Sequence, residues 1–351
     1  MRRVNKQKLT GSLLRELFSK SVGLADGCCP KLNKRFAVLL VIFFFLSLNS
    51  NAQPVNENEA VRVDSGLVDL NVSVFSKNSK LQISSLQKND FIIFENGNAE
   101  VITFFAEAET PFDLILLLDL SGSTQEKLKL IRKSSKKFIE AARPSDRIAI
   151  AAFTSVLKLI TPFTDDRKLL KESIDRIEKP LGGTNFWDSL KLTLEHISDK
   201  EIKSRRRAIV VMTDGVDNAL PGVRGDGSVT TFEGLLETIK RTDSIVVPVY
   251  LDTEKELLKK APYLATPESY AIAREQLEQI AEESGSIVYK ASKVEDLEGV
   301  YKQVIRDLGT VYSIGYQPTN NNRDGSWREL KVNLFNKPDL KVRTRRGYYA
   351  N

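Results

Sequence analysis

Residues 114–123 read Leu-Ile-Leu-Leu-Leu-Asp-Leu-Ser-Gly-Ser and indicate a buried strand that ends at Asp119. An unbroken apolar run is typical of a strand that is covered on both faces, as strands of parallel sheets are. In open α/β sheets, ligands bind beyond the carboxyl ends of the strands. We therefore expect Asp119, Ser121 and Ser123 to lie at the ligand-binding edge of a sheet.

Strands and helices alternate on both sides of this stretch, from Pro111 to about Gly309. The further strands are apolar runs, and the helices between them carry apolar residues three and four positions apart. This alternation predicts an α/β fold with a doubly wound, mostly parallel sheet flanked by helices, Rossmann-like, over residues 111–309. We expect strands over 114–118, 148–153, 208–212, 245–250 and 287–289, and helices over 128–142, 170–177, 190–197 and 297–308.

Short strands separated by turn residues flank the α/β region, over residues 61–110 and 310–351. Segments of this size rarely bury enough apolar surface to fold alone. We therefore predict that the two segments pack together as one small β module, with the α/β domain inserted between them. The expected strands are 70–75, 91–94, 101–105, 311–316, 329–334 and 340–345.

An apolar run at residues 36–48 follows Lys31, Lys34 and Arg35 and precedes Ser50-Asn51-Ala52. This pattern predicts a leader and secretory signal peptide over residues 1–52, cut after Ala52 and followed by a flexible start over residues 53–60. An uncleaved membrane anchor is the alternative, although such a span needs about 20 apolar residues. We expect an exported protein that is periplasmic, displayed on the cell surface or secreted.

The charge of the chain depends strongly on this leader. The whole chain has a formal net charge of +6, but residues 1–52 hold nine Lys and Arg against two Asp and Glu, which leaves the rest at about −1. A near-neutral mature chain gives no indication of nucleic-acid binding. Cys28 and Cys29, the only cysteines, also lie in the leader, so the mature chain would rely on its core for stability.

Two further loops carry oxygen ligands in the same strand-loop context. Thr184 ends Gly182-Gly183-Thr184, and Asp214 lies in Thr213-Asp214-Gly215 directly after a predicted strand. With the Asp119 loop they offer two carboxylates and three hydroxyls, which suits a hard cation such as Mg²⁺, although Mn²⁺ and Ca²⁺ accept the same chemistry. Asp217 and Asn218 follow and could add hydrogen bonds to the ligands, or could only shape the turn.

Together these loops resemble the metal-ion-dependent adhesion site of von Willebrand factor type A domains. The resemblance covers about 200 residues, and the flanking stretches Leu86–Asn96, Gly315–Pro318 and Arg345–Tyr348 resemble exported bacterial proteins called VWFA-related. It implies that Asp119, Ser121 and Ser123 hold the cation. It also implies that Thr184 is a direct or exchanging ligand, and that Asp214 binds directly or through water.

The expected function is metal-dependent ligand binding or adhesion, without catalysis. Two carboxylates at most balance a divalent ion, so the cation can accept a carboxylate from a partner, which would be a protein or peptide, or an acidic glycan. One alternative is a scaffold or assembly module of an envelope complex that works without metal. A membrane partner is expected only if the N-terminal apolar segment stays uncleaved.

A metal-assisted hydrolase is the less favoured alternative. The sequence has no Gly-x-Ser-x-Gly, His-Glu-x-x-His or phosphate-loop motif, and Asp217 is the only nearby candidate for a general base. An intracellular type A domain working with an ATPase is opposed by the export signal. Arg224-Gly225-Asp226, a tripeptide read by some adhesion receptors, lies in the loop from Ala219 to Thr231, and short motifs of this kind are common by chance.

Overall fold

The computed structural model describes residues 66–76, 86–106, 111–122, 127–178, 182–197 and 205–350. All of them belong to one compact unit, Asp64–Asn351. The predicted signal peptide, the flexible start and Ser123 lie outside the described residues, and those predictions stand untested. No helix in the described part of the chain is long and apolar enough to cross a membrane.

A six-stranded sheet forms the centre of the α/β domain, in the order β10-β9-β8-β5-β6-β7. Neighbouring strands are parallel except for β7, which runs antiparallel to β6 at one edge. All residues of β5, the strand that ends at Asp119, are buried, as its apolar sequence predicts. The strands are β5 (Phe112–Asp119), β6 (Arg147–Phe153), β7 (Leu157–Thr164), β8 (Arg206–Thr213), β9 (Ile245–Leu251) and β10 (Tyr289–Ala291).

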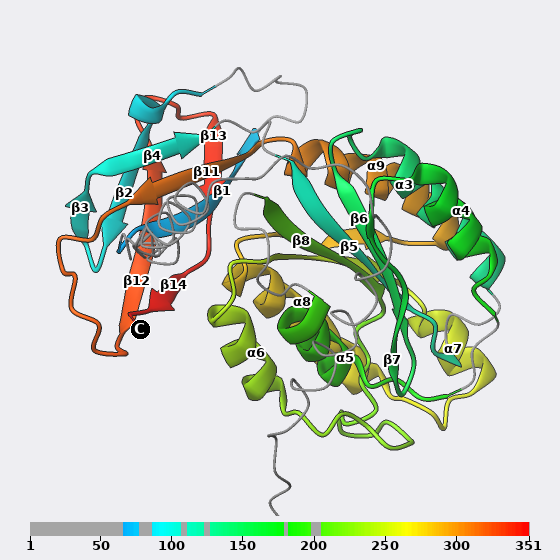
Figure 1. The fold of residues 1–351 in the computed structure, drawn as a ribbon. Helices are drawn as coiled ribbons and strands as arrows, with labels where there is room; N and C mark the ends of the chain where they lie inside the picture. Colours follow the sequence, from blue (N-terminus) through cyan, green and yellow to red (C-terminus); the bar gives the residue numbers. More distant parts are fainter. Residues whose placement is uncertain are drawn as a thin grey trace, which may run out of the picture. The chain divides into compact units, whose positions relative to one another are not determined.

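Helices cover both faces of this sheet (Figure 1). Leu114 and Leu116 of β5 pack into one core with α3, α4 and α9, whereas Ile115 and Leu117 pack into a second core with α5, α6 and α8. The alternation follows from the two-residue period of a strand. The helices are α3 (Leu128–Ala141), α4 (Arg167–Asp175), α5 (Phe186–Leu192), α6 (Phe232–Lys240), α7 (Glu254–Lys260), α8 (Pro267–Glu283) and α9 (Leu297–Leu308), with a π-helix at η4 (Thr193–Ile197) and a 3-10 turn at η5 (Val294–Asp296).

The segments on either side of this domain form a β module of two four-stranded sheets, in the orders β13-β1-β11-β4 and β14-β12-β2-β3. Each sheet combines strands from both segments, and one core joins Leu70 and Val72 to Leu330 and Val332. The predicted fold class is therefore confirmed. The elements are β1 (Val68–Ser76), η2 (Lys88–Asp90), β2 (Phe91–Glu95), β3 (Asn98–Glu100), β4 (Ile102–Ala106), β11 (Val311–Tyr316), β12 (Trp327–Leu334), β13 (Leu340–Arg343) and β14 (Gly347–Tyr349).

The structure differs from the predicted elements in a few places. The last strand of the large sheet is Tyr289–Ala291 instead of 287–289, because its pairing with β9 begins at Tyr289. The edge strand β7 was not predicted, since most of its residues are exposed or half-buried and its apolar pattern is weak. The short strand β14 was missed for a similar reason, because only Gly347 of its three residues is buried.

Candidate metal site

Asp119 and Asp214 come from neighbouring strands of the large sheet. Asp119 is the last residue of β5, and Asp214 directly follows β8, which pairs with β5 in parallel. Parallel neighbours end on the same side of a sheet, so both carboxylates lie at the carboxyl edge that the sequence predicted. They are almost fully buried, with exposed fractions of 0% and 2%.

Each oxygen of Asp119 accepts a hydrogen bond, one from the turn after β5 and one from the last residue of β8. The backbone N–H of Ser121 donates to Oδ1 at 2.9 Å, and the Thr213 hydroxyl donates to Oδ2 at 2.7 Å. The first bond bends the chain just after β5, so Ser121 is also buried close to the carboxylate. The second bond ties the ends of β5 and β8 together and fixes the orientation of Asp119.

Asp214 is held in a similar way by residues of other elements. The N–H of Val216 donates to Oδ1 at 3.1 Å, and the Thr253 hydroxyl donates to Oδ2 at 2.6 Å. Thr253 follows β9, and its hydroxyl lies 3.1 Å from the hydroxyl of Tyr270 in α8. Thr253 and Tyr270 are both buried, so this chain of hydroxyls anchors Asp214 to the adjoining strand and helix.

The electrostatics of the pair fit a bound cation. Burial contributes most to raising the pKa of Asp119, and the charge of Asp214 raises it further. Hydrogen bonds from Thr213 and Ser121 offset part of this, and the pKa of Asp119 is about 7 instead of 3.8. Two buried like charges disfavour full ionisation, whereas a divalent cation between them would favour it.

Hydroxyl ligands would have to complete such a site. In the described part of the chain, no group of three or more His, Cys, Asp or Glu residues is placed to hold a metal. Ser121 is buried beside Asp119, and Thr184, which is 7% exposed, lines the same pocket as Asp214. The donors are therefore carboxylates and hydroxyls, which suit Mg²⁺, Mn²⁺ or Ca²⁺.

The loop that carries Thr184 is fixed by its neighbours. The N–H of Gly183 donates to the Ser155 hydroxyl at 3.0 Å, and the N–H of Asn218 donates to the carbonyl of Thr184 at 2.9 Å. The amide of Asn218 packs so closely that a Cβ added at Gly183 would lie 2.3 Å from its Nδ2. Asn218 thus positions the Thr184 loop.

Asp217 has a structural role in the same region. Its buried carboxylate accepts hydrogen bonds from the N–H groups of Trp187, Ala219 and Ser228, and from the Ser228 hydroxyl at 2.6 Å. These contacts join the start of α5 to both ends of the loop that follows β8. Asp217 therefore shapes the loop, which is the simpler of its two predicted roles.

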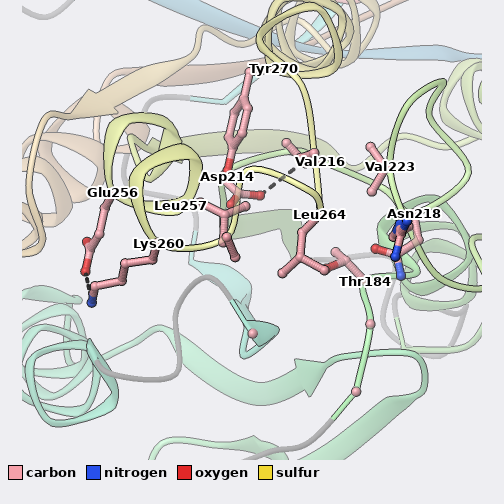
Figure 2. A pocket seen from close by; sticks show the side chains of 16 residues that line it. Thr184, Asp214, Val216, Asn218, Val223, Glu256, Leu257, Lys260, Leu264 and Tyr270 are labelled. Carbon is pink, nitrogen blue, oxygen red and sulfur yellow. Dashed lines mark hydrogen bonds and ion pairs between the residues drawn. The ribbon is translucent and has the colours of Figure 1, made fainter.

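A pocket of about 330 Å³ opens over Asp214 and Thr184. Figure 2 shows Asp214, Leu257 and Leu264 near the middle of the view, with Lys260 on one side and Asn218 on the other. The pocket makes this edge of the sheet accessible to a ligand. Its lining residues are Gly122, Gly182, Gly183, Thr184, Asp214, Val216, Asn218, Val223, Arg224, Glu256, Leu257, Lys260, Ala261, Leu264, Ala265 and Tyr270.

Three residues that orient the carboxylates were missed from the sequence. Thr213 belongs to the Thr213-Asp214-Gly215 motif but was assigned no role, and Tyr270 lies in a helix that was not predicted. Thr253 could have been found, because it follows β9, the strand beside β8. The rule that strand ends line the site applies to that position too.

The family model described as von Willebrand factor type A domain matches residues 113–303, which is more than half of the chain. The chain therefore belongs to the von Willebrand factor type A domain family.

Sequence relatives match only part of the domain. An uncharacterized protein of Borreliella burgdorferi is 29% identical over 116 residues, which cover 30% of this chain and 33% of that protein. E3 ubiquitin-protein ligase WAVH1 of Arabidopsis thaliana is 28% identical over 120 residues, which cover 30% of this chain and 18% of the relative. The chain thus spans a third or less of the length of these curated relatives.

Solved structures are similar at low identity. BatB, a conserved hypothetical protein from Bacteroides thetaiotaomicron, is 14% identical, with a TM-score of 0.41 and coverage of 56% of this chain and 98% of that one. The vWF domain of the type V pili tip protein Mfa5 from Porphyromonas gingivalis is 12% identical, with a TM-score of 0.43 and coverage of 56% and 94%.

Proposed function

We propose that this protein is an exported binding or adhesion component whose type A domain holds a divalent cation, Mg²⁺ in the first instance, at Asp119, Ser121, Ser123, Thr184 and Asp214. When bound, the cation would supply a charged centre that accepts a carboxylate oxygen of a partner. The observation that carries this proposal is the buried pair of Asp119 and Asp214 beneath an open pocket.

The cost of burying this pair supports a functional role. Two adjacent carboxylates away from water destabilise a fold unless a positive charge or a proton balances them. The buried positions one residue before the ends of β5 and β8 are apolar, at Leu118 and Met212. A pair of buried like charges at a pocket that is open to solvent is typical of a ligand-binding site.

The surrounding residues support binding over catalysis. Thr213 and Thr253 hold the two carboxylates in fixed orientations, and the Asn218 backbone fixes the Thr184 loop. Asp217 already accepts bonds from four donors, so it is poorly placed to act as a general base. We therefore propose that this site captures a partner and does not transform it.

A capture experiment tests the proposal. The mature protein would be incubated with envelope and medium fractions of the producing cells, with Mg²⁺ or with EDTA, beside Asp119→Ala and the control Asp165→Ala. Asp165 is exposed in the loop before α4, away from the pocket. We expect a partner that is retained by the wild type and by Asp165→Ala only with Mg²⁺. Partner capture that survives both EDTA and Asp119→Ala would remove the metal from the mechanism and favour a metal-free scaffold.

A further inference from the structure

The pocket beside the candidate metal site has an apolar wall in addition to its oxygen ligands. Val216, Val223, Leu257, Leu264 and Ala265 all line it, and they come from the loops after β8 and around α7. Val216 and Ala265 belong to the core beneath, and Val223 and Leu257 pack against that core. A cation site alone needs no such wall, because metal ligands are polar.

Leu264 has no role in the core that would account for its position. Among the described residues, it belongs to no core cluster and is not packed against one. Its backbone is fixed on both sides, since its N–H donates to the carbonyl of Ala261 at 3.0 Å and its carbonyl accepts from the N–H of Arg224 at 3.0 Å. The half-buried side chain is thus held at the pocket (Figure 2).

The charges around this wall favour an acidic partner. Arg224 and Lys260 line the pocket, and among the described residues Glu256 is the only acidic side chain there besides Asp214. Glu256 is already paired, with Lys260 at 3.0 Å and with Lys127 at 2.7 Å. Once a divalent cation balances Asp119 and Asp214, the remaining side chains leave an excess of positive charge at the rim, which attracts anions.

We propose, on the basis of the proposed function, that the partner is a peptide segment in which an aliphatic residue lies directly beside the acidic residue whose carboxylate reaches the cation. The carboxylate would occupy the cation, and the aliphatic side chain would pack against Leu264 and Leu257. A pocket of about 330 Å³ is near the small end of ligand sites, which fits side chains of an extended segment.

The apolar wall disfavours an acidic glycan as the partner. Sugar hydroxyls would lose water against Val223, Leu257 and Leu264 without gaining hydrogen bonds, which costs free energy. An aliphatic side chain gains from the same transfer. Full burial of a leucine side chain corresponds to roughly ten- to hundred-fold in affinity.

Two peptide probes test the inference directly. Fluorescein-labelled Gly-Leu-Asp-Gly and Gly-Ser-Asp-Gly amides would be titrated with the mature protein in Mg²⁺ and in EDTA, and binding followed by anisotropy. We expect the leucine peptide to bind at least ten-fold more tightly than the serine peptide, and only with Mg²⁺. Leu264→Ser should weaken binding of the leucine peptide and so remove that difference.

A matched control separates the effect of the apolar wall from general effects of a leucine-to-serine substitution. Leu159→Ser changes a leucine that is 48% exposed on β7 and does not line the pocket, so it should retain the preference for the leucine peptide. Asp119→Asn should lose both peptides and still fold, as judged by circular dichroism.

The outcomes distinguish this inference from the proposed function. Equal, Mg²⁺-dependent binding of both peptides would overturn the inference and leave the metal-dependent function intact. Failure of both peptides to bind would also overturn it. So would tighter binding of an acidic glycan probe, trigalacturonate, than of the leucine peptide. Peptide binding that persists in EDTA would contradict the proposed function itself.

Discussion

Asp119 and Asp214 lie at the ends of neighbouring strands, and the negative charge of Asp214 helps to raise the pKa of Asp119. Both carboxylates are buried, yet the pocket over Asp214 is open to solvent. This relationship joins the fold to its proposed function. The parallel pairing of β5 and β8 brings two like charges together at the carboxyl edge of the sheet, where the pocket would admit a cation and a ligand.

Stability without metal should depend on pH through Asp119. Its pKa in the folded protein lies above the ordinary value of 3.8, so the folded protein binds this proton more tightly than the unfolded chain does. The contribution of Asp119 to the free energy of unfolding should therefore fall as pH rises from about 4 to about 7. Urea unfolding in EDTA across this range measures it.

Asp119→Asn provides the comparison for this pH dependence. The variant cannot titrate at residue 119, so its stability should fall less steeply than that of the wild type over the same range. Equal slopes for the two proteins would show that the pair does not titrate as described.

Removing the threonine hydroxyls should weaken metal binding without unfolding the domain. Thr213→Val and Thr253→Val each keep the shape of the side chain but lose the bond to Asp119 or Asp214. Loss of a partner that orients a metal ligand typically lowers metal affinity about 10- to 100-fold. Isothermal titration with Mg²⁺ measures this affinity.

Thr238→Val is a matched control for these two variants. The Thr238 hydroxyl donates to the carbonyl of Gly234 within α6, away from the site. Its Mg²⁺ affinity should equal that of the wild type. Unchanged affinity in Thr213→Val and Thr253→Val as well would rule out the orienting role of these hydroxyls.

Gly225 should be required by the loop geometry. Its φ of +116° is unfavourable for other residues, and a Cβ there would lie 2.4 Å from Nδ2 of Asn218. Gly225→Ala should lower the free energy of unfolding by about 1–3 kcal/mol. Gly299→Ala, at a helical glycine with open space around it, should be neutral or slightly stabilising in the same urea titration.

This test also bears on Arg224-Gly225-Asp226. If the backbone conformation of the loop requires glycine at residue 225, the presence of that glycine needs no explanation from recognition by an adhesion receptor. A Gly225→Ala protein as stable as the wild type would instead leave the glycine without a structural reason.

Glu95 links the two sheets of the β module. Its carboxylate accepts from the Tyr316 hydroxyl at 2.5 Å and from the Tyr348 hydroxyl at 2.9 Å. Burial and Glu95 raise the pKa of Tyr316, so that hydroxyl stays protonated and donates. Tyr316→Phe leaves a buried carboxylate with one donor fewer and should destabilise the protein by about 1–3 kcal/mol.

Urea unfolding of Tyr316→Phe beside Tyr263→Phe checks this expectation. Tyr263 is 63% exposed, so loss of its hydroxyl should change stability little. Equal stability of the two variants would show that Glu95 does not depend on Tyr316.

The sequence predicted the parts of the fold that depend on local pattern. The apolar run 114–118 identified the central strand because a strand buried on both faces needs apolar residues at every position. The edge strand β7 is mostly half-buried or exposed, so its pattern is weak. Its antiparallel pairing depends on a tertiary contact with β6.

The sequence predicted the residues that would contact the cation, but the residues that orient them were missed. Asp119 and Asp214 follow strands that the pattern identified, so the topology brings them together. Thr253 follows β9 and could have been found by the same rule, whereas the contact of Tyr270 with Thr253 depends on how α8 packs in the fold. Such contacts between residues distant in sequence leave no local signal.

Thermal unfolding with and without Mg²⁺ tests most directly whether Asp119 and Asp214 share a divalent cation. At a Mg²⁺ concentration 100-fold above Kd, the wild type should gain about 2.7 kcal/mol of stability. In EDTA above pH 7, where Asp119 of the wild type is ionised, Asp119→Asn should unfold at a higher temperature than the wild type because the repulsion is removed, and it should gain nothing from Mg²⁺. An Asp119→Asn protein that is stabilised by Mg²⁺ as much as the wild type, or a wild type that does not respond, would contradict the account.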